Sequence, residues 1–221
     1  PMFSLDNAFD EAELEALEQR VQRVLGSDAP LDYLAELKID GLSVNLRYED
    51  GVLAWAATRG DGREGEEITP NLRAVEGLPE RIEDAQAELE VRGEVYLPKL
   101  EFARINAARE EAGEEPFANP RNAAAGMMRQ LDPRKVAGPM LDVVFYERLV
   151  VAGGGEYEDH WDFLKALAGW GLNAGEHNRR TRDFGTLRDY HRRLLENRND
   201  LPYEIDGVVA KVDAFSLRDS L

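Results

Sequence analysis

Cysteine is absent from this 221-residue sequence, and basic residues are few relative to acidic ones. A chain without cysteine forms no disulfide and no thiolate metal site, and its composition fits a reducing compartment. Lys and Arg number 27 against 44 Asp and Glu, a formal net charge of −17. Tight nonspecific binding to duplex DNA requires basic side chains that neutralise phosphates. The composition therefore argues against such binding, and any contact with DNA must be local or assisted.

The sequence also lacks an apolar run of membrane-spanning length and a secretory signal core. We therefore expect a cytoplasmic, monomeric protein with no membrane partner. The chain begins at Pro1 instead of Met and ends at Leu221, which suggests a segment of a longer protein. The three histidines, His160, His177 and His191, have no ligand-like spacing, so we expect them in capping or surface positions.

Hydrophobic periodicity predicts both strands and helices along the chain. The expected helices cover about residues 10–26, 98–113, 161–170 and 186–197, and the expected strands cover about 34–59, 89–97, 141–146 and 203–212. Asp50-Gly51 and Asp61-Gly62 are strong hairpin-turn signals. Hairpin-linked strands with segregated helices favour an α+β fold, with antiparallel sheets flanked by helices, over a doubly wound parallel sheet.

The most informative stretch is the strand-like segment 36–41, which contains a lysine between two carboxylates. Strand alternation puts Glu36, Lys38 and Asp40 on one face, so the three side chains face a common site. For so short a motif, the alternative is a solvated strand face with a cross-strand ion pair.

Further motifs favour the functional interpretation. They occupy residues 57–62, 89–94, 117–126 and 205–211. Together with residues 1–7 and 36–41, in the same order and over essentially the whole chain, they closely resemble the adenylation (nucleotidyltransferase) domain of bacterial NAD-dependent DNA ligases. The resemblance implies one domain over residues 1–221 with the ATP-grasp-like nucleotidyltransferase fold, incomplete at its C-terminal end. It also implies that the family's N-terminal nicotinamide-binding module and its OB-barrel, zinc, helix-hairpin-helix and BRCT modules are absent from this sequence.

The resemblance implies the reaction of a ligase of DNA replication and repair. Lys38 attacks the α-phosphate of NAD, releases nicotinamide mononucleotide and becomes joined to AMP through a P–N bond. AMP then passes to the 5′-phosphate of nicked double-stranded DNA, and the 3′-hydroxyl expels it and seals the strand. A lysine attacks only as the neutral amine, and the developing charge at phosphorus requires positioning and cationic stabilisation. Mg²⁺ or Mn²⁺ is the implied metal, with zinc confined to the absent C-terminal module.

The resemblance also implies roles for individual residues by motif position. The expected catalytic residues are Lys38, Asp40 and Asp206. The expected nucleotide-binding residues are Ser4, Leu5, Glu36, Lys38, Arg59, Glu94 and Lys211. The expected phosphate- or DNA-binding residues are Arg121, Arg129 and Arg198, since arginine forks suit phosphate.

The family positions further imply that Glu36 reads the adenine edge, that Arg59 holds the ribose or phosphate region, and that Glu94 bonds the ribose hydroxyls or supports the metal. Asp40 and Asp206 are the candidates to attract Mg²⁺, which is usually held by one or two carboxylates with phosphate and water. Asp40 alternatively orients a ribose.

One geometric question stays open in the sequence. Asp206 and Lys211 differ in parity, so a regular strand would point them to opposite faces, whereas a bulge at Gly207 would bring both to the site.

Alternative functions also stay open. A nucleotidyltransferase that uses ATP or GTP is the nearest one, because a lysine before Asp-Gly also occurs in ATP-dependent ligases and capping enzymes. The motifs around Arg59 and over residues 119–132 favour the NAD family. More distant from the motifs are a silent nucleic-acid-binding or scaffolding domain and a Schiff-base lysine enzyme.

Overall fold

In the computed structural model, the described residues are 11–26, 31–83, 87–136, 140–152 and 157–218. The predicted nucleotide-binding residues Ser4 and Leu5 lie outside this range, as does Asp10 at the start of the first expected helix.

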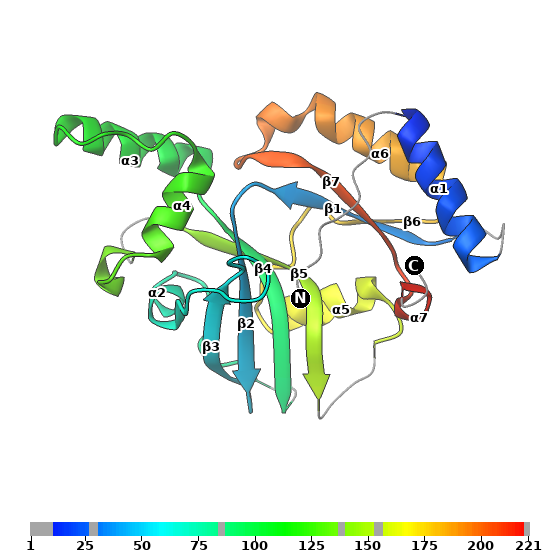
Figure 1. Ribbon diagram of the computed structural model, residues 1–221, viewed down its shortest axis with the longest axis horizontal. Coiled ribbons are helices and arrows are strands. Elements are labelled where there is room, and N and C mark those ends of the chain that lie inside the picture. Colours follow the sequence, from blue (N-terminus) through cyan, green and yellow to red (C-terminus); the bar gives the residue numbers. More distant parts are fainter. Residues whose placement is uncertain (1–10, 27–30, 84–86, 137–139, 153–156, 219–221) are drawn as a thin grey trace.

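Two antiparallel sheets form the centre of the molecule, which confirms the predicted α+β fold (Figure 1). The three-stranded sheet has the order β6-β1-β7, with β6 at Arg179–Thr181, β1 at Tyr33–Ile39 and β7 at Ile205–Val212. The four-stranded sheet has the order β3-β2-β4-β5, with β3 at Val52–Thr58, β2 at Leu42–Glu49, β4 at Glu88–Tyr96 and β5 at Asp142–Ala152. Every strand pair is antiparallel.

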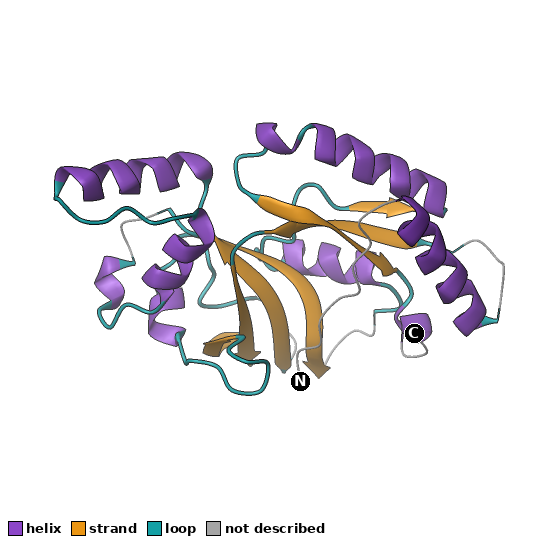
Figure 2. Ribbon diagram, turned by 45° about the horizontal axis from the view of Figure 1, so that its top comes forward, coloured by secondary structure: helices purple, strands orange, loops and turns teal. Residues whose placement is uncertain are grey.

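Helices flank both sheets (Figure 2). They are α1 (Glu11–Leu25), α2 (Thr69–Arg73), α3 (Lys99–Glu111), α4 (Pro120–Met128), α5 (His160–Gly169), α6 (Phe184–Glu196) and α7 (Phe215–Arg218), with 3₁₀ turns at Pro133–Lys135 and Arg198–Asp200. Helices α1 and α6 lie over the outer side of the three-stranded sheet, and α3 projects away from the body (Figure 1). Among the helices of the described residues, none combines the length and apolar character needed to cross a membrane.

Strand alternation separates an apolar face from a polar face in the four-stranded sheet. Val44, Leu46 and Tyr48 of β2 are fully buried in the main core, where Phe163 and Leu167 of α5 also pack. The opposite face of β4 carries charged residues at alternate positions, as the sequence predicted. Because this polar face is turned away from the core, it is available to line a site between the two sheets.

The turn at Asp50-Gly51 confirms its prediction. Both residues have positive φ, 47° and 77°, as a two-residue hairpin turn requires. The second hairpin signal, Asp61-Gly62, gives a different structure. The chain turns back toward β3 there, but it pairs with β3 only through an isolated bridge between Ala57 and Glu67. The next regular element is the helix α2 and not a strand. The Asp61 carboxylate accepts hydrogen bonds from the backbone N–H groups of Arg63 and Glu64, which hold this loop in place.

The connection from β1 to β2 carries the chain from one sheet to the other (Figure 1). Asp40 donates its backbone N–H to the Glu204 carbonyl oxygen at 2.9 Å, which ties this corner to the segment before β7. A Cβ on Gly41 would lie 2.2 Å from the Val95 carbonyl oxygen. The close approach of the corner to β4 therefore requires glycine at position 41.

Replacing Gly41 with Ala should destabilise the domain, because the clashing atom belongs to the backbone of β4 and cannot move aside freely. We expect a loss of roughly 1–3 kcal/mol in the free energy of unfolding, as for other overpacked positions, measured by urea denaturation. Gly169→Ala is the matched control, since nothing lies within 4 Å of a Cβ there. Equal stability of Gly41→Ala and wild type would contradict the close approach.

Candidate active site

A polar cavity of about 750 Å³ lies between the two sheets, with α4 at one side. The strands of both sheets line it, and so does the loop after β3. The predicted site residues that line the cavity are Glu36, Lys38, Arg59, Glu94, Arg121, Arg129 and Lys211. The fold therefore brings together residues from motifs that are widely separated in the sequence.

Strand β1 presents Glu36 and Lys38 to this cavity from one face, as alternation predicted. Asp40, the third residue of that prediction, follows the end of β1 at Ile39 and is not among the residues that line the cavity. The two environments differ strongly. The Glu36 residue is 3% exposed, whereas the Lys38 side chain is 44% exposed at the mouth. Lys38 Nζ lies 2.5 Å from Oδ2 of Asp206 on β7. The lysine is thus accessible to an incoming phosphate and is held by a carboxylate on the neighbouring strand.

The bulge in β7 settles the parity question. Lys38 pairs with Gly207 and Ile39 pairs with Ile205, so the register shifts there and Asp206 is the extra residue. Gly207 has a φ of 154°, which residues with a Cβ rarely adopt. Because of the bulge, both Asp206 and Lys211 contact side chains of the same face of β1.

Glu36 is a buried carboxylate that stays ionised. Burial raises its pKa, but the nearby Lys211 ammonium and His160 more than offset this, and the resulting pKa is about 2. Lys211 Nζ forms an ion pair with Glu36 Oε2 at 2.7 Å and donates to the Tyr146 carbonyl oxygen at 2.5 Å. Apart from this ion pair at Oε2, the Glu36 oxygens have no hydrogen-bond partner among the described residues. The carboxylate therefore retains acceptor capacity at the inner end of the cavity.

Glu94 on β4 is the second unusual carboxylate. Burial raises its pKa to about 7, although Arg121 and Lys38 act in the opposite direction. The Tyr146 hydroxyl lies 3.4 Å from Glu94 Oε2 and 2.9 Å from the Ser43 hydroxyl. Near neutral pH, this carboxyl group is therefore present in both the neutral and the ionised form.

The loop after β3 positions Arg59. Its backbone N–H donates to the Ser43 carbonyl oxygen at 2.9 Å, and the next residue, Gly60, has a φ of 56°. A Cβ on Gly60 would lie 1.7 Å from the Glu64 carbonyl oxygen, so the loop requires glycine. None of the ion pairs among the described residues includes the Arg59 guanidinium.

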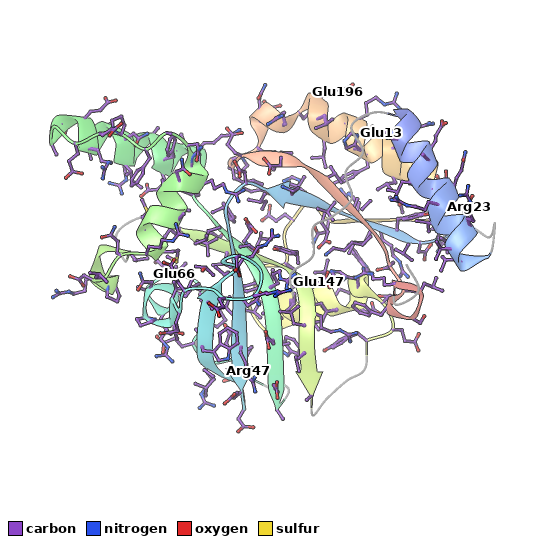
Figure 3. The ribbon with its side chains drawn as sticks, in the orientation of Figure 1. Glu13, Arg23, Arg47, Glu66, Glu147 and Glu196 are labelled. Carbon is purple, nitrogen blue, oxygen red and sulfur yellow. The ribbon has the colours of Figure 1, made fainter. Side chains whose placement is uncertain are left out.

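Arg121 of helix α4 and Arg129, the residue that follows its last turn, are both paired with carboxylates. Arg121 Nη1 lies 3.1 Å from Asp40 Oδ1, and Arg129 Nε lies 2.6 Å from Glu66 Oε2. Glu66 lies beside α2, as Figure 3 shows. The Asn119 side chain accepts from the backbone N–H of Asn122 and so begins the helix that positions both arginines.

Arg198 lies apart from the other predicted residues. It does not line the cavity, and its Nη2 donates to the Ile205 carbonyl oxygen at 3.1 Å. In this structure it braces the start of β7, next to the bulge that positions Asp206.

The structure identifies further cavity residues that the sequence analysis did not assign. Ser43, Arg92, Tyr146 and Glu147 line the cavity from the polar face of the four-stranded sheet. Glu147 lies between the two sheets (Figure 3). The alternation of β4 predicts that the Arg92 side chain lies on the polar face of the sheet. Tyr146 and Glu147 could be placed only once β5, which runs to Ala152 instead of ending near residue 146, was known.

The prediction for His160 was wrong. We expected a capping or surface role, but the side chain is fully buried, with Nε2 3.7 Å from Glu36 Oε1. The cap of α5 is Asp159, whose side chain accepts from the backbone N–H of Asp162. The spacing of the histidines in the sequence could not show this, because the residues that cover His160 come from distant parts of the chain.

The described residues contain no group of three histidine or acidic side chains arranged to hold a metal ion. Asp40 and Asp206 are each paired with a cation, Arg121 and Lys38 respectively. This arrangement fits only a metal that takes most of its ligands from phosphate and water, as Mg²⁺ commonly does.

Comparisons with known proteins identify the family of this chain. A model of the NAD-dependent DNA ligase adenylation domain matches residues 1–221. A DNA ligase of Alkalilimnicola ehrlichii is 50% identical over 100% of this chain and 33% of its own length. A DNA ligase of Geobacter sulfurreducens is 48% identical over the same shares, 100% and 33%. A mycobacterial DNA ligase D structure has a TM-score of 0.47 and 15% identity, covering 83% of this chain and 49% of its own, a likeness too weak to support any argument.

The chain spans about one third of the length of these DNA ligases. The match to the domain model nevertheless covers every residue of the chain. The chain belongs to the NAD-dependent DNA ligase adenylation domain family.

Proposed function

We propose that this domain transfers AMP from NAD to Lys38, as the first step of DNA ligation. The observation that carries the proposal is the position of Lys38, exposed at the mouth of a cavity whose inner end holds a buried carboxylate and whose α4 side holds arginines. Such a cavity orders a nucleotide from base to phosphate. The Lys38 amine, once neutral, attacks the α-phosphorus, and nicotinamide mononucleotide leaves.

Glu36 and Lys211 form the proposed adenine end of the cavity. The ionised Glu36 carboxylate accepts from the exocyclic amine of adenine and opposes the carbonyl oxygen of guanine. Oε1 has no hydrogen-bond partner among the described residues, and the carboxylate is buried. Both observations support this role, because a buried acceptor without a hydrogen bond gains most from a matching donor. Tyr146 lies beside this end and supplies an aromatic surface.

Arginines form the proposed phosphate end. Arg59 has no carboxylate partner within the described part of the chain, whereas Arg121 and Arg129 are paired with Asp40 and Glu66. An incoming phosphate replaces these carboxylates as the partner of each guanidinium and accepts charge-assisted hydrogen bonds. With Mg²⁺ bound near Asp40 and Asp206, the metal would add further neutralisation of the phosphate charge.

The later steps belong to the whole protein and extend the proposal. The adenylate on Lys38 passes to the 5′-phosphate of nicked DNA, and the 3′-hydroxyl then seals the nick. The domain has a net charge of −17, which opposes DNA binding, so other modules must hold the DNA. Other modules would also hold the nicotinamide half of NAD. We place this activity in the bacterial cytoplasm, where the chromosome lies. We also propose that the domain itself is a monomer. Arg198 would approach DNA only outside the cavity.

Intact-mass measurement after prolonged incubation with NAD, with ATP or with neither tests the proposal. Because the nicotinamide half of NAD is not held by this domain, we expect slow addition of one AMP to wild type with NAD. We expect none on Lys38→Ala, which has no amine, and none on Lys38→Arg, because a guanidinium stays protonated and cannot attack phosphorus. Lys165→Ala is the matched control, since Lys165 is a solvent-exposed lysine of α5 that pairs with Asp162. Retention of acid-labile AMP on Lys38→Ala would exclude Lys38 as the nucleophile. Addition of AMP to wild type with ATP but not with NAD would exclude the NAD assignment.

Glu94 is the proposed ligand of the ribose hydroxyls, and its titration is measurable. Its pKa of about 7 in the folded domain lies above the ordinary value of 4.5, so the fold favours the protonated form of Glu94. The stability that comes from this preference is fully present below pH 4.5 and is lost as the pH rises through 7. Glu94→Gln should therefore gain stability relative to wild type between pH 4.5 and pH 8. Carbon-13 NMR of the glutamate carboxyl carbons reads the pKa directly, and ionisation near pH 4.5 would contradict the burial argument.

A further inference from the structure

His160 lies behind the proposed adenine end, outside the residues that line the cavity. Its ring is fully buried, packs edge-on against Phe163 at 6.0 Å between ring centroids, and lies 5.6 Å from Phe215. Nε2 is 3.7 Å from Oε1 of Glu36. Neither Nε2 nor Oε1 has a hydrogen-bond partner among the described residues. A buried donor and a buried acceptor thus face each other at the back of the cavity.

The position of His160 is tightly set by the end of β7. The His160 backbone N–H donates to the Asp213 carbonyl oxygen at 3.0 Å, and the next N–H, of Trp161, donates to the Asp213 carboxylate at 2.9 Å. Arg180 joins this carboxylate at 2.6 Å and that of Asp159 at 3.0 Å. The first turn of α5 is therefore clamped to the strand that carries Asp206 and Lys211.

The tautomer of His160 follows from its other nitrogen. Nδ1 lies 2.8 Å from Nη1 of Arg218, and a guanidinium has donors only, so Nδ1 must accept. The proton of the neutral ring is then on Nε2, which faces Glu36. Burial and the nearby Lys211 ammonium lower the pKa of His160, which keeps the ring neutral although Glu36 and Glu147 act in the opposite direction.

We propose that His160 is a positioning residue for Glu36 and thereby sets the preference of the domain for adenine. The Nε2–H of His160 faces Oε1 at 3.7 Å, a charge–dipole contact longer than a hydrogen bond, and the Lys211 ammonium pairs with Oε2 at 2.7 Å. Each oxygen of the carboxylate thus has one polar neighbour that favours its orientation. In this orientation its remaining lone pairs face the cavity and meet the exocyclic amine. The inference rests on the proposed adenine role of Glu36 and adds the group that orients it.

Calorimetric titration of AMP and IMP tests this inference, because the two nucleotides differ in whether the base offers an amine or a carbonyl oxygen to Glu36. Three variants separate the two ring nitrogens. His160→Gln places an amide near the position of Nε2, His160→Asn places one near Nδ1, and His160→Phe keeps the ring shape without either nitrogen. Phe163→Leu is the control for packing alone, since Phe163 is a fully buried neighbour on the same helix.

We expect His160→Asn and His160→Phe to lower the AMP-to-IMP affinity ratio by roughly tenfold, the size of one net polar interaction with a charged group. His160→Gln should keep the ratio near that of wild type, and Phe163→Leu should lower the melting temperature without changing the ratio. An unchanged ratio in His160→Asn or His160→Phe would overturn the inference, and so would equal losses in His160→Gln and His160→Asn. If His160→Phe does not fold, the comparison of Gln with Asn still decides. A wild-type domain that does not prefer AMP would instead refute the adenine role of Glu36.

Discussion

An ionised carboxylate in a protein interior must be offset by cations and donors, and this requirement organises the centre of the domain around Glu36. Lys211 from β7 supplies the charge, and His160 from α5 supplies the facing N–H. Arg218 from α7 approaches both His160 and Glu147 of β5. One buried group thus links three strands and two helices. Because its pKa is lowered to about 2, its contribution to stability is present above pH 4.5 and is lost as the pH falls toward 2.

The mouth of the cavity follows a different principle. Here Lys38, Arg121 and Arg129 are half exposed and each pairs with one carboxylate, from Asp206, Asp40 and Glu66 respectively. Exposed ion pairs contribute little to stability, so they can be exchanged for contacts with a phosphate at small cost. In the proposed function, the inner pairs hold the base end of the cavity, and the outer pairs are exchanged at the phosphate end. This division explains how a domain of net charge −17 can offer a cationic site.

Much of the fold and part of the site could be predicted from local patterns. Alternation placed Glu36 and Lys38 on one face, and the Asp50-Gly51 turn has the predicted positive φ values. The β7 bulge stayed an open question because parity alone could not locate an irregularity in the ladder; Gly207 was the signal that permitted it. His160 could not be predicted, since its burial depends on Arg218, Asp213 and Glu36, which are remote in sequence. Arg198 was predicted to bind phosphate or DNA from its motif position, whereas in the structure its guanidinium donates to the backbone carbonyl oxygen of Ile205.

The central claim is that the cavity orders an adenosine nucleotide from Glu36 at its inner end to Lys38 at its mouth. A crystal structure of the domain with AMP tests this claim most directly, because it locates base and phosphate independently of any reaction. The account predicts the exocyclic amine within hydrogen-bond distance of Glu36 and the phosphate next to Lys38, with Arg121 and Arg129 released from Asp40 and Glu66. A base at the mouth, or a phosphate beside Glu36, would contradict it.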